Sequence, residues 1–239
     1  MGELKYKRVL LKISGEGFCR EGGFGLEGEQ LRSVARQCVE VAKMGVQLAV
    51  VVGGGNFLRG SKLAAASHIH EATAHYMGML STVINALAVQ ETMESMGQPT
   101  RVMSAITVAS VCEPFIRRRA VRHLEKKRAI ILAGGTGNPF FTTDTCAALR
   151  ATELGADAVL KATKVDGIYS ADPKKNRAAK LYKQITYEEV LRKKLRVMDL
   201  TAITMLMEHK VSLVVFNLKR DGNIMRVVKG QSVGTEIRP

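Results

Sequence analysis

Three short segments of the chain carry residue types that suit phosphate binding. Lys12 stands just before Ser14 and Gly15, which places a cation beside exposed backbone N–H groups. The glycines at 53–55 let backbone approach an anion closely. Residues 142–144 (Thr-Thr-Asp) open a predicted helix, where N–H groups and the helix dipole favour a phosphate. Together the three segments predict a site for a phosphate-bearing ligand.

Each of these segments also has a simpler interpretation when it is taken alone. Lys12 is then a solvated lysine at a strand end, and the glycine run is a tight turn. Asp144 is then a helix cap with the usual stabilisation of about 1 kcal/mol. The functional interpretation is favoured over these simpler ones, because all three segments are predicted to lie at one edge of one sheet.

The elements that must position these segments alternate between strands and helices. Short apolar runs predict strands at residues 8–13, 46–52, 101–104, 129–132, 158–160, 213–216 and 225–228. Apolar residues at helical spacing predict helices at residues 29–44, 72–96, 114–127, 143–154, 187–193 and 201–209. Residues 172–184 are polar and basic, which predicts a surface loop.

The strands are continuous apolar runs rather than alternating patterns. This favours an α/β fold with a mostly parallel sheet covered on both faces. Glycine-rich loops follow three of the strands, at residues 14–17, 53–56 and 134–137. In such folds ligands bind outside the carboxyl ends of the strands, so the loops predict the place of the site.

Composition and charge narrow the class of protein. The chain has 239 residues, 46% hydrophobic and 24% charged, which excludes a disordered chain. Its net charge of +14 indicates an anionic partner. We expect neither a membrane span nor a secretory signal, because no apolar run approaches the roughly 18 residues that a span needs. We also expect no metal site at His68, His70, Glu71 and His75, because they lack the H-E-x-x-H spacing.

The cysteines and the common nucleotide motifs narrow the class further. The four cysteines are widely spaced, which argues against disulfides and zinc and favours a reducing cytoplasm. The sequence contains no G-x-x-x-x-G-K-[ST] motif, which excludes a P-loop enzyme. It also has no G-x-G-x-x-G after a strand, which argues against a dinucleotide fold and against a protein kinase.

A set of motifs in a fixed order carries a resemblance to a known family. They are KISGE at 12–16, GGGN at 53–56 with RG at 59–60, MGML at 77–80, TGNPFFTTD at 136–144, KATKVDGIY at 161–169, ADP at 171–173 and VMDL at 197–200. With these motifs the chain resembles the bacterial UMP kinase (uridylate kinase) family of the amino acid kinase superfamily over nearly its whole length. The run at 136–144 is the specific one, because the Lys-x-Ser-Gly and Gly-Gly-Gly-Asn motifs are shared across the superfamily.

The resemblance implies a fold, a reaction and a set of partners. The fold is a three-layer α/β/α sandwich, with residues 1–239 forming a single domain. The reaction is ATP + UMP → ADP + UDP, with magnesium, on the pyrimidine route. The resemblance also implies a cytoplasmic homohexamer. Many members of the family are activated by GTP and inhibited by UTP, so both nucleotides are possible regulators.

The resemblance further implies a role for particular residues. The residues implied for ATP are Lys12, Ile13, Ser14, Gly15, Gly55, Arg59, Thr163, Tyr169 and Asp172. Those implied for UMP are Gly54, His75, Thr136, Gly137, Asn138, Pro139, Phe140, Phe141, Thr142 and Thr143. Those implied for the catalytic centre are Lys12, Arg59, Asp144 and Asp199. Those implied for activation by GTP are Arg20, Glu21, Gly22, Gly23, Phe24 and Gly25.

One position departs from the family pattern. The family usually has an aspartate, which binds the UMP ribose, two residues before the Met-Gly-Met-Leu run, and this chain has His75 there. An imidazole donates or accepts one hydrogen bond but lacks the paired acceptors of a carboxylate. We therefore expect altered ribose recognition, or substitution by a neighbour such as Glu71.

The chemistry of the implied reaction needs positioning and charge neutralisation more than a general base. The acceptor is a phosphate with a second pKa near ~6, so it is mostly dianionic at neutral pH. Lys12 is then expected to neutralise the transferred group with magnesium and Arg59. Asp199 is expected to orient Lys12 or the metal, with a helix N-cap as the equal alternative. Lys161 and Lys164 could add positive potential, and neither is favoured.

Two alternative functions stay open at this point. One is another small-molecule kinase of the same superfamily, acting on a carboxylate or carbamate. The other is a nucleic-acid-binding regulator, suggested by basic runs at residues 117–128, 174–175 and 192–194. Aromatic residues are only 5% of the chain and tryptophan is absent, so base stacking has little support and nucleic acid is not the expected partner.

Overall fold

The computed structural model describes residues 4–58, 63, 65, 68–171, 173, 176 and 178–239. Within this part of the chain, nine strands form one sheet in the order β4-β3-β5-β2-β1-β6-β8-β9-β7. The strands are β1 (Arg8–Ile13), β2 (Gln47–Val52), β3 (Thr100–Ser104), β4 (Glu113–Pro114), β5 (Ala129–Ala133), β6 (Ala158–Thr163), β7 (Gln184–Thr186), β8 (Ser212–Asn217) and β9 (Thr235–Arg238). Neighbours are parallel except β8 and β9, so the strands from β4 to β8 in this order end at one edge of the sheet.

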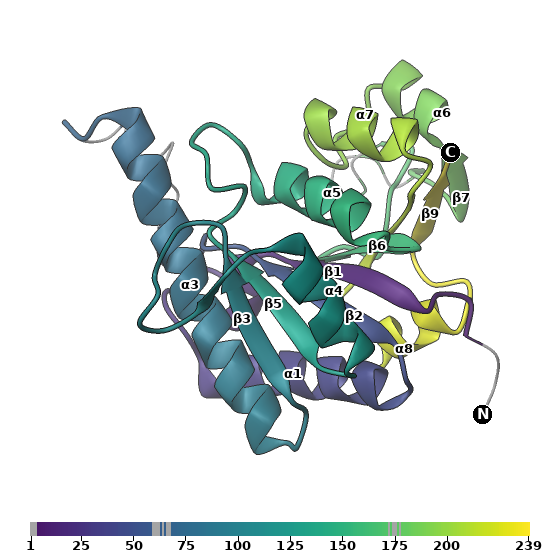
Figure 1. Ribbon diagram of the computed structural model, residues 1–239. Coiled ribbons are helices and arrows are strands. Elements are labelled where there is room, and N and C mark those ends of the chain that lie inside the picture. Colours follow the sequence, from purple (N-terminus) through teal and green to yellow (C-terminus); the bar gives the residue numbers. More distant parts are fainter. Residues whose placement is uncertain are drawn as a thin grey trace.

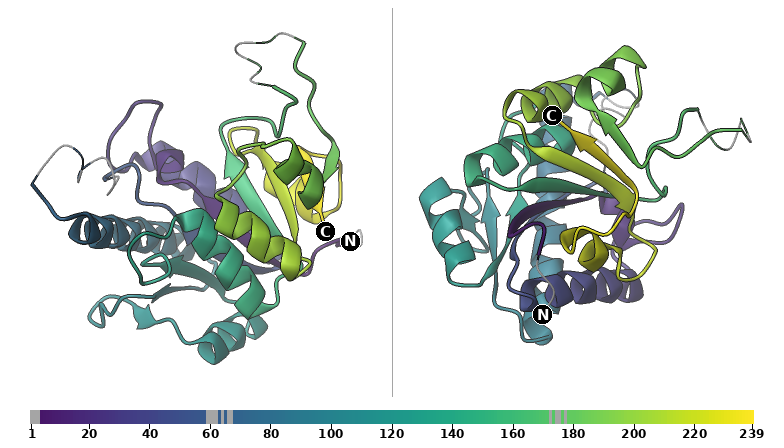
Figure 2. Two further views of the ribbon diagram at one scale, coloured as in Figure 1. Left: turned by 90° about the horizontal axis from the view of Figure 1, so that it is seen from above. Right: turned by 90° about the vertical axis from the view of Figure 1, so that its right-hand side faces the viewer.

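Helices cover both faces of the sheet (Figures 1 and 2). They are α1 (Gly28–Lys43), α3 (Glu71–Ser95), α4 (Arg117–Glu125), α5 (Thr143–Leu154), α6 (Tyr187–Arg192), α7 (Leu200–Glu208) and α8 (Asn223–Val228), with the short 3-10 helix η1 (Gly15–Phe18). One hydrophobic core joins α1, α3 and α8 to the sheet, and a second core joins α4, α5, α6 and α7 to the opposite face. The expected three-layer α/β/α arrangement is thereby confirmed.

The pleat of β1 decides on which face its lysine lies. Val9, Leu11 and Ile13 pack in the core beside α1, whereas Leu10 packs in the core beside α5. Because side chains alternate along a strand, Lys12 shares the face of Leu10 and lies beneath α5. The same alternation in β6 places Lys161 on the face of Val159, which also packs beside α5.

One predicted strand is wrong. Residues 225–228 were expected to be a strand but belong to helix α8. The apolar run is short, and its buried residues Ile224, Val227 and Val228 recur at helical rather than alternating spacing. Strands β4, β7 and β9 were not predicted, and the expected loop at residues 172–184 lies partly outside the described residues.

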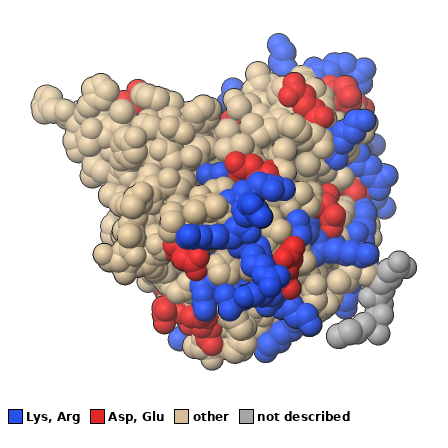
Figure 3. All heavy atoms as spheres, viewed as in Figure 1, with Lys and Arg blue, Asp and Glu red and all other residues tan. Residues whose placement is uncertain are grey.

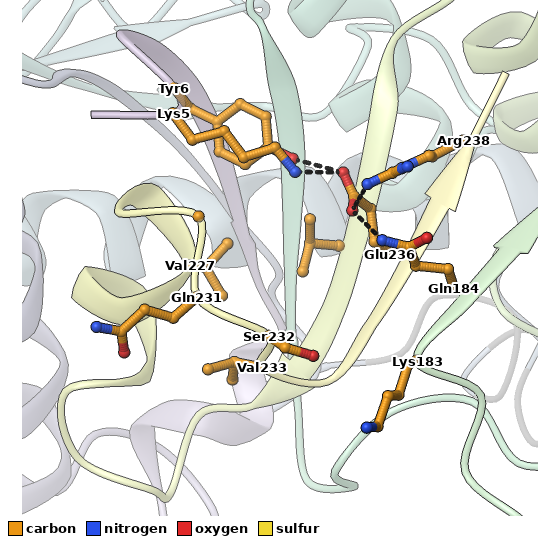
Figure 4. A pocket seen from close by; sticks show the side chains of 12 residues that line it. Lys5, Tyr6, Lys183, Gln184, Val227, Gln231, Ser232, Val233, Glu236 and Arg238 are labelled. Atoms are coloured by element: carbon orange, nitrogen blue, oxygen red, sulfur yellow. Dashed lines mark hydrogen bonds and ion pairs between the residues drawn. The ribbon is translucent and has the colours of Figure 1, made fainter. Parts of the chain in front are cut away.

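A polar cluster connects residues near the start of the described chain to strand β9 near its end (Figure 4). In the sheet, β9 lies toward the opposite side from β3 and β4. Glu236 of β9 pairs with Lys5 at 2.6 Å and with Arg238 at 2.8 Å, and accepts a hydrogen bond from Tyr6 at 2.9 Å. Partial burial alone would raise the pKa of Glu236, but hydrogen bonds from Arg238, Lys5 and Tyr6 outweigh burial and lower this pKa to about 2. The cluster therefore connects the first described residues to β9, the strand next to the edge strand β7.

Replacing Glu236 with glutamine is expected to destabilise the fold at neutral pH by about 1 kcal/mol. The pKa of Glu236 is lower in the folded state than its ordinary value of 4.5, so the carboxylate stabilises the fold above that value. This stabilisation is lost as the pH falls toward 2. Urea unfolding of wild type and variant should therefore differ at pH 7 and converge near pH 2. Glu208→Gln, at an exposed position, is the control, and a constant difference at all pH values would contradict the assignment.

Candidate active site

Two lysines and one carboxylate form the charged centre of the site. Lys12 and Lys161 are direct partners in the register of β1 and β6, so their side chains lie next to each other. Asp144, in the first turn of α5, pairs with Lys12 at 2.8 Å and with Lys161 at 2.6 Å. All three side chains are at least four-fifths buried. Two cations and one anion leave this nearly dry cluster with a surplus positive charge.

Burial and neighbouring charges act against each other in this cluster. Burial alone would raise the pKa of Asp144, but Lys12 and Lys161 outweigh it and hold this pKa below its usual range. Burial lowers the pKa of Lys161, and the charge of Lys12 adds to that shift against the opposing effect of Asp144. Lys161 also donates a hydrogen bond to the backbone oxygen of Val197 at 2.5 Å. The carboxylate therefore stays ionised between two cations that would otherwise repel each other.

A second carboxylate organises the helix ends around this centre. Asp199 is the N-cap of α7 and accepts a hydrogen bond from the backbone of Ala202 at 2.8 Å. It also accepts hydrogen bonds from the hydroxyls of Thr142 and Thr145. Thr142 is in turn the N-cap of α5, accepting from the backbone of Asp144 at 3.0 Å. Asp199 thus ties the starts of α5 and α7 together.

The structure shows Asp199 as a helix N-cap, which is one of the two roles expected of it. Within the described part of the chain, the carboxylate that pairs with Lys12 is Asp144 and not Asp199. The N-cap alternative describes what Asp199 does, and its two threonine contacts make it a positioning residue for α5. No metal-ligating cluster of three histidine, cysteine or acidic side chains is found among the described residues.

The two glycine loops that follow β1 and β2 lie against each other. A methyl group added at Gly15 would come within 2.6 Å of the backbone nitrogen of Gly55, so only glycine fits there. Asn85 of α3 donates a hydrogen bond to the backbone oxygen of Gly53 at 2.7 Å and pairs with the amide of Asn56. The buried pair of Asn85 and Asn56 therefore holds the glycine loop that follows β2 in place.

A cavity of about 450 Å³ opens at these loops on the carboxyl edge of the sheet. Many of its lining residues were expected to bind nucleotide. These are Ser14, Gly15, Gly54, Gly55, His75, Phe140, Phe141, Thr142 and Thr143. The cavity therefore joins the loops after β1 and β2 to the N-terminus of α5, beside the lysine pair.

His75 holds one wall of this cavity. Its Nδ1 atom accepts a hydrogen bond from the backbone N–H of Phe140 at 3.3 Å, and the two rings lie 5.2 Å apart. Phe140 has a φ of 71°, a left-handed conformation that is uncommon for a residue with a side chain. The Nε2 atom of His75 lies 3.6 Å from Oε1 of Glu71. The acceptor atom of the imidazole is thus occupied by the protein's own backbone.

The remaining expected site residues are placed differently or fall outside the described part. Arg59 and Asp172 lie outside the described residues. Thr136 and Asn138 hydrogen bond to each other within a loop, and residues 136–139 do not line the cavity. Thr163 ends β6, and Tyr169 forms an isolated bridge with Leu181.

The loop at residues 20–25 is attached directly to the glycine loop after β2. Gly25 and Asn56 exchange two hydrogen bonds, at 2.9 and 2.8 Å. Phe24, although 76% exposed, makes an edge contact with Phe57, with ring centroids 5.7 Å apart. The loop therefore contacts Asn56 and Phe57, which lie in the chain between the cavity-lining residues Gly55 and Leu58.

The sequence named Lys161 only as one of two lysines that could add positive potential, and it gave no indication of Thr145 or Asn85. The signal for Lys161 was a charged residue inside an apolar strand, a pattern that it shares with Lys12. The two lysines lie side by side only because β1 and β6 are neighbours in the sheet, and the sequence alone did not predict the strand order. Thr145 and Asn85 act through contacts with distant segments and carry no local motif.

In the view of Figure 3 the basic residues gather over the centre and the right-hand side of the molecule, whereas the side formed by α3 shows few of them. A group of arginines on α4 surrounds a shallow hollow and consists of Arg117, Arg118, Arg119 and Arg122. They are exposed, unlike Lys12 and Lys161. None of the helices in the described residues combines the length and the apolar character that crossing a bilayer requires.

Residues 7–217 match the sequence profile of the Amino acid kinase family. Solved structures extend the similarity over almost the whole chain. UMP kinase from Bacillus anthracis has 36% identity and a TM-score of 0.94, covering 98% of this chain and 96% of that one. UMP kinase from Ureaplasma parvum has 32% identity and a TM-score of 0.92, covering 98% and 100%. Uridylate kinase from Archaeoglobus fulgidus has 30% identity and a TM-score of 0.72, covering 96% and 99%.

Proposed function

The chain belongs to the Amino acid kinase family, and we propose that it transfers the γ-phosphoryl group of ATP to UMP, giving ADP and UDP. The observation that carries this proposal is the Lys12–Asp144–Lys161 cluster beside a cavity lined by two glycine loops and the start of α5. A surplus positive charge at this place suits a reaction that brings two polyanions together. The UMP kinases of similar structure supply the identity of the acceptor.

Each group of the site has a task in this reaction. Lys12 neutralises the charge that develops on the transferred phosphoryl group, and Lys161 adds to the same field. Asp144 holds both ammonium groups in place, and Asp199 fixes the start of α5 through Thr142 and Thr145. Ser14, Gly15 and Gly55 present backbone to the phosphates, and Gly54, Phe140 and Thr143 line the acceptor side. No side chain is needed as a base, because the acceptor phosphate is already ionised.

Magnesium fits this site as an ion carried by the phosphates of ATP. Both oxygens of Asp144 face lysines, and Asp199 accepts hydrogen bonds from Thr142, Thr145 and Ala202. These carboxylates are therefore already engaged, and magnesium commonly binds through substrate phosphates and water. When bound with ATP, the ion supplies further neutralisation of phosphate charge.

A panel of phosphate acceptors tests the proposed function. ADP release is measured with ATP and magnesium, using UMP, CMP, acetylglutamate or carbamate as the acceptor. UMP is expected to give the highest kcat/KM. A preference for acetylglutamate or carbamate would instead assign another small-molecule kinase of the same family.

His75 is expected to support UMP binding by holding Phe140. His75→Ala removes the acceptor for the backbone N–H of Phe140, so UMP affinity should fall about fivefold, the value of one hydrogen bond of about 1 kcal/mol. His75→Asp retains an acceptor and should bind UMP more tightly than His75→Ala. Titration calorimetry with UMP measures both, with His209→Ala, an exposed residue on α7's end, as control. Equal affinity in the two His75 variants would remove His75 from the site.

We further propose regulation by GTP and UTP. The contacts of Gly25 with Asn56 and of Phe24 with Phe57 support activation by GTP at residues 20–25, because that loop is joined to the glycine loop of the cavity. UTP carries the same base as UMP, which supports inhibition by UTP. Initial rates with each nucleotide added separately test both effects.

We propose a homohexamer built from a single domain of residues 1–239, working in the cytoplasm in pyrimidine nucleotide biosynthesis. The nine strands of the described residues form one sheet, which supports a single domain. Helix α3 exposes Tyr76, Leu80 and Ile84, one turn apart, each 46 to 49% exposed. A stripe of this kind supports packing against another copy of the chain. Light scattering should give six times the mass of one chain.

A further inference from the structure

Helix α3 presents one face to the loops of the candidate active site. His75, Gly78, Thr82 and Asn85 share this face, because residues three, four or seven positions apart lie on the same side of a helix. Three of them, His75, Gly78 and Thr82, line the cavity of about 450 Å³. This face of α3 therefore borders the proposed nucleotide site over several turns.

The hydroxyl of Thr82 links α3 to the loop that follows β5. Its oxygen accepts a hydrogen bond from the backbone N–H of Gly134 at 2.7 Å. The hydroxyl donates its own hydrogen to the backbone oxygen of Met79, in the preceding turn of the helix, at 2.6 Å. Because a hydroxyl has a single hydrogen, this second contact directs a lone pair toward Gly134. Thr82 is only 3% exposed, so water has little access to the contact.

Gly134 is the point at which the chain leaves β5 and turns toward the site. Its φ is 73°, a left-handed conformation, and a methyl group there would come within 2.9 Å of the Oγ atom of Ser104. The chain then runs to the start of α5, and we call residues 134–142 the acceptor loop. The residues of this loop that line the cavity are Gly135, Phe140, Phe141 and Thr142.

Three contacts hold the acceptor loop, at its start, its middle and its end. The first is the contact of Thr82. At the middle, His75 accepts a hydrogen bond from the backbone of Phe140 at 3.3 Å. At the end, Thr142 donates a hydrogen bond to Asp199. The first two contacts come from α3, at positions about two turns apart, so one helix holds most of the loop.

The same face of α3 also holds the glycine loop that follows β2. Asn85, which is fully buried, donates a hydrogen bond to the backbone oxygen of Gly53 at 2.7 Å. A methyl group added at Gly54 would come within 2.8 Å of the backbone oxygen of Gly78, so this loop lies directly against the helix. Helix α3 therefore sets the separation between the glycine loop, implied for both nucleotides, and the acceptor loop, implied for UMP.

We propose that Thr82 is a positioning residue for phosphoryl transfer, which holds the acceptor loop at the separation from the glycine loop that the reaction needs. This role rests on the proposed function and deepens it, because neither the resemblance nor the charged cluster assigns a part to Thr82. Transfer between two phosphates requires the reacting atoms to be aligned, and a displacement of about 1 Å can cost a hundredfold in rate. Thr82 acts on the reaction through the acceptor loop.

Thr82→Val keeps the shape of the side chain and removes its hydroxyl. The kcat/KM for UMP should fall roughly tenfold or more, because the acceptor loop loses its contact at Gly134. The KM for ATP should stay within about twofold of the wild-type value, because the glycine loop keeps its contacts with α3. Thr82→Ser retains the hydroxyl and should recover most of the lost kcat/KM.

Thr92→Val is the matched control on the same helix. Thr92 is half-buried, and its hydroxyl donates to the backbone oxygen of Ala88 at 2.7 Å, as that of Thr82 does to Met79. Thr92 does not line the cavity, so the variant should keep the wild-type kcat and both wild-type KM values. All variants are assayed well below their measured melting temperatures, so that loss of folded protein does not contribute to the rates.

Asn85→Leu separates positioning of one loop from a general loosening of α3. Asn85 holds the glycine loop, so in this variant the KM for ATP should rise roughly fivefold, whereas in Thr82→Val it should not. A general loosening of the helix would give the two variants the same pattern.

Three results would overturn the role of Thr82: wild-type kcat/KM for UMP in Thr82→Val, an equal rise of the KM for ATP and for UMP in that variant, or no recovery in Thr82→Ser. The wild-type rate with UMP distinguishes this failure from that of the proposed function. No turnover of UMP by the wild-type protein would refute the proposed function and this role with it. Normal wild-type turnover with any of the three results would refute the role of Thr82 alone.

Discussion

Replacing Lys12 with alanine should reduce kcat with UMP by at least about a hundredfold, because it removes a cation that acts on the charge of the transition state. The free energy of unfolding should change little. In the wild-type protein Asp144 lies between two lysines, and without Lys12 it still pairs with Lys161 at 2.6 Å. The variant thus exchanges a cluster with surplus charge for a neutral pair, and leaves no buried charge without a partner.

Steady-state kinetics and urea unfolding of the same preparation measure both expectations. Lys7→Ala is the matched control, because Lys7 is exposed and lies just before the same strand. Its kcat should stay within about twofold of the wild type, as is usual for surface substitutions. Near-normal turnover in Lys12→Ala would remove Lys12 from the catalytic role.

Replacing Asp144 with asparagine should damage both activity and stability. It leaves Lys12 and Lys161 side by side without the anion between them, and removing one partner of a buried ion pair costs roughly 3 kcal/mol. We expect kcat to fall by roughly a hundredfold, because the lysine that acts on the phosphoryl group loses its positioning contact. Asp221→Asn makes the same change in an exposed pair with Arg36 and should cost less than about 1 kcal/mol.

The pH dependence of this loss follows from the pKa of Asp144. The lysines hold this pKa below its ordinary value of 3.8 in the folded state, so the carboxylate stabilises the fold above that value. The stabilisation is lost as the pH falls through the lowered folded-state pKa. The difference in unfolding free energy between wild type and Asp144→Asn should therefore be full at pH 7 and shrink below pH 3.8.

A double variant separates the two effects of Asp144→Asn. Adding Lys161→Met removes the second cation, so the repulsion disappears and most of the lost unfolding free energy should return. Activity should not return, because Lys12 still lacks its carboxylate partner. A double variant as unstable as the single one would show that repulsion between the lysines is not the cause.

Local signals explain why the sequence predicted so much of the fold. Helix α5 was predicted with its observed ends, because Thr142 caps its start and Gly155 ends it with a φ of 64°. The glycine loops were placed at one edge because parallel strands end on the same side of a sheet. The run at 225–228 was mispredicted because a short apolar segment fits a strand and a buried helix equally well.

The parts that escaped prediction depend on contacts between distant segments. Lys161 meets Lys12 only because β6 lies beside β1, although the two strands are about 150 residues apart in the chain. The occupied acceptor atom of His75 depends on the unusual backbone of Phe140. Residue type and spacing were enough to predict where the site lies. The balance of charges inside it could be determined only once the three-dimensional structure showed which charged residues are neighbours.

Transfer of a labelled phosphoryl group is the most direct test of the central claim. The protein is incubated with magnesium, UMP and ATP labelled at the γ-phosphate, and the products are separated. We predict label in UDP, with initial rates at least about a hundredfold lower in Lys12→Ala. Label in inorganic phosphate alone, or equal labelling of UDP by the Lys12→Ala variant, would contradict the account.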